Sequence, residues 1–178
     1  MLAITRNAEG KPMLPKWPPR AGSCDRQTLW SCTVSNGAFW RRRVSDKVGT
    51  FNESLGVGAP TPYQSSEEIE YFLRALESGF RVIYVPEISV FHSEYQSIER
   101  LRRTTYNYAL GIGCVAGVHA YSWWFLAKML ARSLGGAAAS LCRAQFAMSR
   151  LYLLRAAGQL RGYVWGPRDL ALLQSRED

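Results

Sequence analysis

The pattern of hydrophobic and polar positions divides the first 48 residues into three segments. Residues 1–28 hold four prolines and two glycines without a regular period, which predicts an irregular N-terminal segment. Residues 29–39 begin with β-favouring side chains and end near an Asn-Gly turn signal, so we expect extended chain there. Residues 40–48 are typical of a short helix that ends at Gly49.

The clearest helix signal follows a loop. Residues 51–63 contain two glycines and two prolines and predict that loop. Ser65, with Glu68 three positions later, matches a capping box and predicts a helix N-terminus. Apolar residues then recur every three or four positions until Gly79, where we expect the helix to end. These apolar residues are Ile69, Phe72, Leu73, Leu76 and Phe80.

A strand and a helical tail complete the pattern. Residues 81–91 predict a strand that Pro86 interrupts and that leads to His92. Residues 106–127 carry no formal charge and are long enough for a bilayer, but their glycines and polar residues make them a weak membrane-spanning candidate. Beyond them, basic residues among Leu, Ala and Met predict helices that lie in the plane of a membrane surface, with a break at Gly135-Gly136.

Charge is distributed unevenly along the 178 residues, whose net charge is +8. Residues 1–95 carry 11 basic and 10 acidic side chains, whereas residues 96–178 carry 11 basic and 4 acidic ones. Between Arg100 and Arg168 there are ten Lys or Arg residues and no Asp or Glu. A region that is both basic and apolar, and that lacks a nucleic-acid-binding motif, favours an anionic lipid surface over nucleic acid as its partner.

The cysteines show no metal-binding spacing. No two of the four are spaced as CxxC, and only two histidines are present, so we expect no zinc site. We expect buried free thiols in a reducing compartment, and the N-terminus lacks the pattern of a signal peptide. The cysteines are Cys24, Cys32, Cys114 and Cys142.

Three stretches, taken in order, resemble the acceptor-side half of a family 2 (GT-A type) glycosyltransferase. Residues 36–56 combine a small-residue turn, an aromatic residue, three arginines and Gly-x-Phe-Asn-Glu, with Asn52 where the family usually has Asp. Residues 65–79 are similar to the Glu-Asp helix of the family, and residues 81–92 to its strand pair ending in a histidine. Residues 100–113 resemble the Arg-rich, Tyr-x-x-Gly-x-Gly tail of members that build bacterial surface polysaccharides.

The resemblance implies an α/β fold: a partial GT-A (nucleotide-diphospho-sugar transferase-like) domain at residues 29–95, then a basic helical, membrane-associating tail at residues 96–178. The donor-binding half of the family, with the Asp-x-Asp that holds Mg²⁺ or Mn²⁺, has no counterpart, because the four aspartates of this chain include no Asp-x-Asp. We therefore expect a divalent metal in the complete enzyme only, and no transferase activity from this chain alone.

The resemblance places the catalytic base at Glu68, with Glu67 beside it. An inverting transfer needs a base that takes the proton of the acceptor hydroxyl as that hydroxyl attacks the anomeric carbon. Neighbouring carboxylates raise each other's proton affinity, whereas a helix N-terminus favours the ionised form. The other interpretation, ordinary capping of a helix by acidic residues, stays open. On the same helix, we expect Arg74 to pair with Glu70 or Glu77.

Five further residues are candidates for substrate binding: Gly37, Arg43, Gly56, Gly58 and His92. In related enzymes the matching histidine helps to hold the metal or the diphosphate, which makes His92 the metal-binding candidate. Each has a simpler interpretation: a polar residue at a strand edge for the histidine, a solvated helix face for the arginine, and turns or a flexible loop for the glycines.

Two functions remain open at this stage. The first is a family 2-like glycosyltransferase fragment that, with its missing donor-binding half, transfers sugar from a nucleotide-sugar to a glycan or lipid-linked acceptor. We expect it at the cytoplasmic face of the bacterial inner membrane, peripheral or with one weak membrane-spanning segment. The second is a non-catalytic, membrane-peripheral partner protein, which requires only the basic tail and an exposed apolar face.

Overall fold

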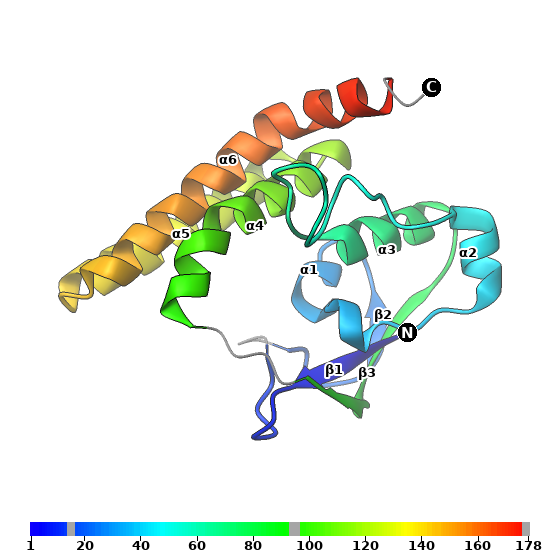
Figure 1. The fold of residues 1–178 in the computed structure, drawn as a ribbon. Coiled ribbons are helices and arrows are strands. Elements are labelled where there is room, and N and C mark those ends of the chain that lie inside the picture. Colours follow the sequence, from blue (N-terminus) through cyan, green and yellow to red (C-terminus); the bar gives the residue numbers. More distant parts are fainter. Residues whose placement is uncertain (14–16, 93–96, 176–178) are drawn as a thin grey trace. The chain divides into compact units, whose positions relative to one another are not determined.

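The computed structural model describes residues 1–13, 17–92 and 97–175 and shows a mixed α/β chain (Figure 1). The chain divides into two compact units. The first unit comprises Met1–Asn52 and Glu67–Tyr95, and the second comprises Glu53–Ser66 and Gln96–Asp178. The boundary predicted between residues 95 and 96 lies outside the described residues.

A three-stranded mixed sheet belongs to the first unit. Its central strand, β3 (Val82–Phe91), pairs in parallel with β1 (Leu2–Arg6) and antiparallel with β2 (Gly22–Cys24). Ala3 pairs with Val85, but the next residue of β1, Ile4, pairs with Ser89. Three residues of β3, beginning with Pro86, therefore bulge out of the ladder, because proline has no N–H to donate to it. The predicted interruption is confirmed as a bulge within one continuous strand.

The prediction of an irregular segment at residues 1–28 is wrong at β1 and β2. The first four residues of β1 are all buried, so this strand lacks the alternation that marks a half-exposed strand. Its partner β3 lies far along the sequence, so no local pattern contains the pairing. Five and three residues are also too few to establish a period.

Residues 29–39 form helical turns, α1 (Leu29–Cys32) and a 3₁₀ turn η1 (Ser35–Gly37), instead of the predicted extended chain. The cause lies just upstream. The Asp25 carboxylate accepts hydrogen bonds from the backbone N–H groups of Gln27 and Thr28, at 2.9 and 2.8 Å. This Asx turn starts a helical turn whose local geometry overrides the β preference of the side chains.

Two predicted helices are confirmed in the first unit. α2 (Arg42–Val48) ends at Gly49, with φ 84°, and α3 (Glu67–Glu77) is followed by Gly79, with φ 85°. Both glycines occupy the left-handed region that ends helices readily. α3 contacts α1, α2 and β3, and it buries its aromatic face. The ring of Tyr71 stacks on Phe51 at 4.7 Å and lies 5.2 Å from that of Trp40.

The second unit is a helical assembly in which α6 (Phe146–Gln174) packs against α4 (Ile98–Val118) and α5 (Trp123–Cys142). Glycines allow close approach of α4 and α6 (Figure 1). A Cβ atom on Gly117 would lie 2.5 Å from the Tyr163 carbonyl oxygen, and one on Gly158 would lie 2.7 Å from the Tyr106 carbonyl oxygen. The two backbones therefore touch where a side chain would separate them.

The expected helix break at Gly135-Gly136 is wrong, because α5 continues through both residues. A Cβ atom on Gly136 would lie 2.7 Å from the Tyr152 ring, so this glycine serves packing and not termination. The chain turns instead at residues 143–145, where Ala144 has φ 55°.

The weak membrane-spanning segment at residues 106–127 is also not found. This segment contains the end of α4 and the start of α5, and the chain leaves the helix between them, where Ala120 has φ 51°. In the described part of the chain, no helix is long and apolar enough to cross a membrane.

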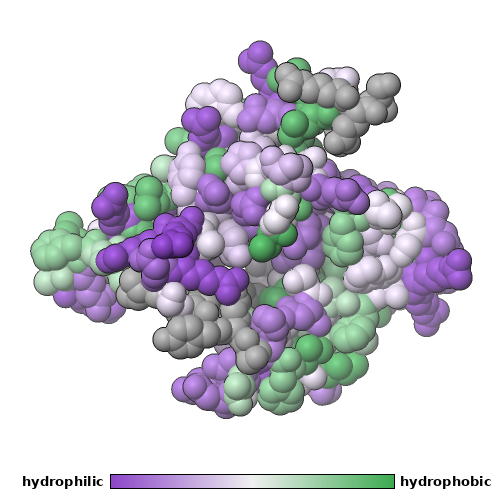
Figure 2. All heavy atoms as spheres, in the orientation of Figure 1, coloured by the Kyte–Doolittle hydropathy of each residue, from purple (hydrophilic) through white to green (hydrophobic). Residues whose placement is uncertain are grey.

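Exposed apolar side chains are frequent on the helices of the second unit. In Figure 2 hydrophobic atoms gather at the left, at the end where α5 and α6 meet. On the helices of the second unit, the most exposed large apolar residues are Trp123 at 65% and Trp124 at 69%, at the start of α5, and Phe146 at 69%, at the start of α6. The predicted basic and apolar tail is therefore helical, with part of its apolar surface uncovered.

Candidate functional site

The acidic N-terminus of α3 is the feature on which the sequence-based site depends. Its first turn carries Glu67, Glu68 and Glu70. Glu70 is buried and ion-paired, whereas Glu67 and Glu68 are half-buried. In the described part of the chain, neither Glu67 nor Glu68 forms an ion pair. The three carboxylates thus divide into one ion-paired group, Glu70, and two, Glu67 and Glu68, that interact with each other.

The environment of Glu68 favours its protonated form. Burial is the largest cause, the negative charge of Glu67 adds to it, and together they raise the pKa of Glu68 to about 7. A hydrogen bond from the backbone N–H of Glu68 itself acts in the opposite direction. The effect of the Glu67 charge on the pKa of Glu68 could be predicted from the sequence. The effect of burial could not, because burial depends on the tertiary structure. A carboxyl group with a pKa near neutral pH can both accept and release a proton.

The capping box predicted at Ser65 and Glu68 stays a prediction, and the Ser65 hydroxyl has partners within the second unit. The Ser65 hydroxyl donates a hydrogen bond to the carbonyl oxygen of Tyr108 in α4, at 2.7 Å, and lies 3.3 Å from the Ser66 hydroxyl. Ser66 has φ 71°, a left-handed conformation that residues other than glycine rarely adopt. This sharp backbone turn comes directly before Glu67, the first residue of α3. Such strain is frequent at functional sites, although it has structural causes as well.

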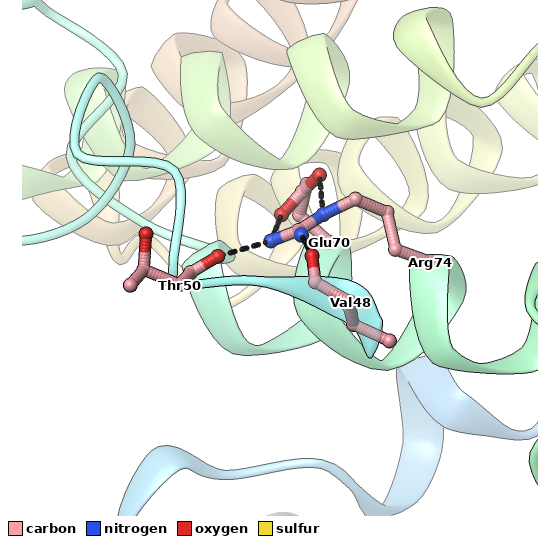
Figure 3. A network of polar contacts seen from close by, with 4 residues as sticks. All are labelled: Val48, Thr50, Glu70 and Arg74. Atoms are coloured by element: carbon pink, nitrogen blue, oxygen red, sulfur yellow. Dashed lines mark hydrogen bonds and ion pairs between the residues drawn. The ribbon is translucent and has the colours of Figure 1, made fainter. Parts of the chain in front are cut away.

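Arg74 pairs with Glu70, as expected, and the pair connects α3 to the segment that follows α2. Arg74 Nε and Nη2 donate to the two carboxylate oxygens of Glu70, at 2.7 and 3.0 Å. The same guanidinium donates to the carbonyl oxygens of Val48 and Thr50, at 2.5 and 2.7 Å (Figure 3). With its donors used in this way, Arg74 has a structural role beside the carboxylate pair.

The remaining candidates of the first unit lie in different settings. His92 follows β3, is exposed, and donates its backbone N–H to the carbonyl oxygen of Arg6 at 2.9 Å. Arg43 is exposed on α2. Gly37 is buried, and a Cβ atom there would lie 2.7 Å from the carbonyl oxygen of Ala3, so its packing against β1 already requires glycine. In the described residues no hydrogen bond or ion pair joins His92 to Glu67 or Glu68.

Gly56 and Gly58 belong to the loop of the second unit, and both have positive φ, 95° and 90°. The N–H of Gly56 donates to the carbonyl oxygen of Tyr63 at 2.9 Å, and that of Gly58 donates to Gln64 Oε1 at 3.0 Å. The Tyr63 hydroxyl in turn donates to Asp169 of α6, at 2.6 Å. The loop is therefore ordered by internal hydrogen bonds, and the prediction that its glycines approach a substrate stays a prediction.

A hollow of about 300 Å³ adjoins this loop, lined by residues that include Gln64, Arg100, Arg103, Asn107 and Tyr108. Two guanidinium groups and several hydrogen-bonding side chains suit an anionic or polyhydroxylated ligand. The Arg-rich start of α4 belongs to a family-like stretch of the sequence, whereas Gln64 and Asn107 carry no such signal. No sequence signal places these residues together, because loop and helix meet only in the folded unit.

No cluster of three or more His, Cys, Asp or Glu side chains that could hold a metal ion occurs among the described residues. Searches against protein-family models, curated proteins and solved structures found no match to this chain.

Proposed function

We propose that this chain is the acceptor-side part of an inverting, family 2-like glycosyltransferase in which Glu68 is the general base. The observation that carries the proposal is the half-buried position of Glu68 beside Glu67 in the first turn of α3, and this position raises the pKa of Glu68. A base is most effective when its pKa lies near the working pH, because it is then ionised yet still basic enough to take a proton. The order of the three family-like stretches in the sequence supports the same proposal.

In this proposal Glu68 accepts the proton of the acceptor hydroxyl while the hydroxyl oxygen attacks the anomeric carbon and the nucleoside diphosphate leaves. Glu67 keeps the proton affinity of Glu68 high through its negative charge. The nucleotide-sugar and its metal belong to a donor-binding half, which a separate chain or segment would supply. The acceptor is a glycan or a lipid-linked sugar.

The test reconstitutes transfer from two parts. The chain is mixed with, or fused to, a donor-binding half that carries Asp-x-Asp, and transfer from a panel of radiolabelled UDP- and GDP-sugars to membrane extracts is measured. We expect no turnover by the chain alone, and transfer by the reconstituted pair that falls about 100-fold or more in Glu68→Gln. Glu77→Gln, which removes an exposed carboxylate at the other end of α3, is the matched control and should keep activity.

Full activity of Glu68→Gln in an active reconstituted pair would remove Glu68 as the base. Sugar-nucleotide hydrolysis by the purified chain alone, abolished by the same substitution, would show instead that no second half is needed.

A second candidate function, a membrane-peripheral partner protein, is favoured by a separate observation. Trp123 and Trp124, at the start of α5, are 65% and 69% exposed. Lys128 lies 5.4 Å from the Trp124 ring, and no acidic side chain occurs between Arg100 and Arg168. Exposed tryptophan beside basic residues is the composition that binds at the interface of an anionic bilayer.

Vesicle flotation tests this second candidate. We expect the chain to float with phosphatidylglycerol vesicles at low salt, to be released by high salt, and not to float with phosphatidylcholine vesicles. Trp124→Ala should weaken flotation several-fold. Phe91→Ala, which removes a 66% exposed ring from the first unit, is the matched control and should leave it unchanged. Absence of flotation at low salt would remove the membrane proposal and leave the transferase proposal untouched.

A further inference from the structure

Two buried cysteines of the first unit face each other at short range. The Sγ atoms of Cys24 and Cys32 are 3.3 Å apart. Cys24 ends the edge strand β2, is 5% exposed and pairs with Val82, and Cys32 ends α1 and is fully buried. A disulfide has an S–S length of about 2.05 Å, so a small rotation of either side chain would bring the sulfurs within bonding distance.

The turn between the two cysteines holds them in this arrangement. Asp25 and Thr28 form a reciprocal set of hydrogen bonds: the N–H of Asp25 donates to Thr28 Oγ1 at 2.7 Å, and the N–H of Thr28 donates to Asp25 Oδ1 at 2.8 Å. The Cys32 thiol also lies within 3.1 Å of the carbonyl oxygen of Thr28. The turn therefore holds the backbones of the two cysteines close together, and only a side-chain rotation is needed to bring the sulfurs into contact.

We propose that Cys24 and Cys32 form a dithiol that a hydroperoxide oxidises to an intramolecular disulfide. Cys24 is the attacking residue, and Cys32 is the resolving one. Because β2 is a three-residue edge strand whose Gly22 and Ser23 are exposed, local opening of this strand admits a small oxidant to the sulfur of Cys24.

The chemistry balances with one hydroperoxide. The Cys24 thiol gives up its proton, and its thiolate attacks one peroxide oxygen. The O–O bond breaks, Cys24 becomes a sulfenic acid, and the departing hydroxide (or alkoxide) takes up that proton to leave as water (or an alcohol). The Cys32 sulfur then attacks the Cys24 sulfur, and the S–S bond forms as the sulfenic oxygen leaves with two protons as water. The net change is two thiols and H₂O₂ to one disulfide and two waters.

The surroundings of the two sulfurs support this division of roles. The hydrogen bond from Cys32, followed by one from Thr28, lowers the pKa of Cys24 against the opposing effect of burial. The hydrogen bond to Cys24 and burial both raise the pKa of Cys32. Cys24 is therefore the sulfur that more readily becomes a thiolate, which is the reactive form.

Peptide mapping tests the proposal on the full chain. The reduced chain is treated with H₂O₂, remaining thiols are blocked with N-ethylmaleimide under denaturing conditions, and tryptic peptides are analysed by mass spectrometry. Cleavage after Arg20, Arg26 and Arg41 places the two cysteines on separate peptides, residues 21–26 and 27–41. We expect these peptides to be joined, at a mass two hydrogens below their sum, at least tenfold more often than either is joined to the Cys142 peptide. Dithiothreitol should separate them.

Variants assign the roles. In Cys32→Ser we expect no linked peptide and a dimedone adduct on Cys24, whereas in Cys24→Ser we expect neither a linked peptide nor an adduct on Cys32. Cys114→Ser, which alters another buried thiol, is the matched control and should keep the link. The proposal is overturned if Cys24 and Cys32 both remain fully alkylated at peroxide doses that oxidise the exposed Cys142, or if their links to Cys142 are as frequent as the link between them.

Discussion

The Arg74 guanidinium donates to both carboxylate oxygens of Glu70, one turn earlier on α3, at 2.7 and 3.0 Å. The Glu70 side chain is 7% exposed and that of Arg74 is 28% exposed. The pair is thus largely withdrawn from water, and the same guanidinium holds the carbonyl oxygens of Val48 and Thr50. The Arg74 side chain therefore joins α3 to the last residue of α2 and to Thr50 just beyond it. Its partner Glu70 lies two residues after Glu68 of the proposed site.

Replacing Arg74 by Ala should destabilise the first unit by about 3 kcal/mol, because it leaves the Glu70 carboxylate buried without its partner. Urea denaturation followed by circular dichroism measures the change. Arg103→Ala removes the partner of Glu99 in a pair whose side chains are 78% and 61% exposed, and should change stability by less than about 1 kcal/mol. A double variant, Glu70→Gln with Arg74→Met, should recover part of the loss. Equal effects of the two single variants would contradict the structural role of Arg74.

The Glu68 carboxyl should titrate near pH 7 in the folded chain, as followed by ¹³C NMR of labelled glutamate. Glu67→Gln should lower this pKa but leave it above the ordinary value of 4.5, because burial is the larger cause. A titration midpoint near 4.5 in the unaltered chain would show that the carboxyl is solvated.

The same shift makes a prediction for stability. A folded-state pKa above the unfolded one means that the folded chain binds a proton more tightly, so the contribution of Glu68 is most favourable below about pH 4.5 and is lost as the pH rises through about 7. Glu68→Gln should therefore be more stable than the unaltered chain at pH 8, by no more than about 3 kcal/mol, and equal to it at pH 4. Denaturation at the two pH values checks this, and a variant that is less stable at pH 8 would reverse the assigned sign.

Gly113→Ala in α4 should destabilise the second unit by about 2 kcal/mol or more, because the new methyl group would overlap the backbone of Gln159 and Tyr163 in α6. Gly135→Ala, on α5, is the matched control. Nothing lies within 4 Å of its added Cβ atom, so it should stabilise the helix by about 1 kcal/mol. Thermal unfolding of both variants, with opposite signs expected, tests whether the glycines of α4 are required for packing.

Tyr63→Phe should release the glycine loop from α6. The buried hydroxyl of Tyr63 donates to Asp169, and burial followed by this hydrogen bond raises its pKa, so it remains a donor at all ordinary pH values. Its removal should increase amide hydrogen exchange in residues 53–66 about tenfold, equivalent to about 1.4 kcal/mol of local stability. Tyr106→Phe, where no hydroxyl hydrogen bond occurs in the described structure, should leave the exchange unchanged.

The predicted elements that the structure confirms are those with strong local signals. α3 has an apolar period and a terminal glycine, and α2 has the same kind of stop at Gly49. The elements predicted wrongly depend on partners far along the chain. The sequence predicts irregular chain at β1 because the partner strand, β3, lies far along the chain. It predicts a helix break at Gly136 because the Tyr152 ring that packs on this glycine belongs to another helix.

In the candidate site too, local features could be predicted from the sequence, whereas features that depend on distant parts of the chain could not. A sequence identifies Glu67 and Glu68 as neighbours and predicts that each raises the proton affinity of the other. It does not show that burial is the larger cause of the raised pKa of Glu68, nor that the Ser65 hydroxyl donates to the carbonyl oxygen of Tyr108. The sequence also does not predict that the Sγ atoms of Cys24 and Cys32 lie 3.3 Å apart, because a spacing of eight residues matches no familiar cysteine motif.

The parallel pairing of β1 with β3 has a consequence for synthesis of the chain. At ribosomal speeds of roughly 5–20 residues per second, the roughly 80 residues between the two strands take several seconds or more to emerge. Throughout that delay the apolar side chains of Leu2 and Ile4 have no sheet to join, and they are available to chaperones or to other nascent chains.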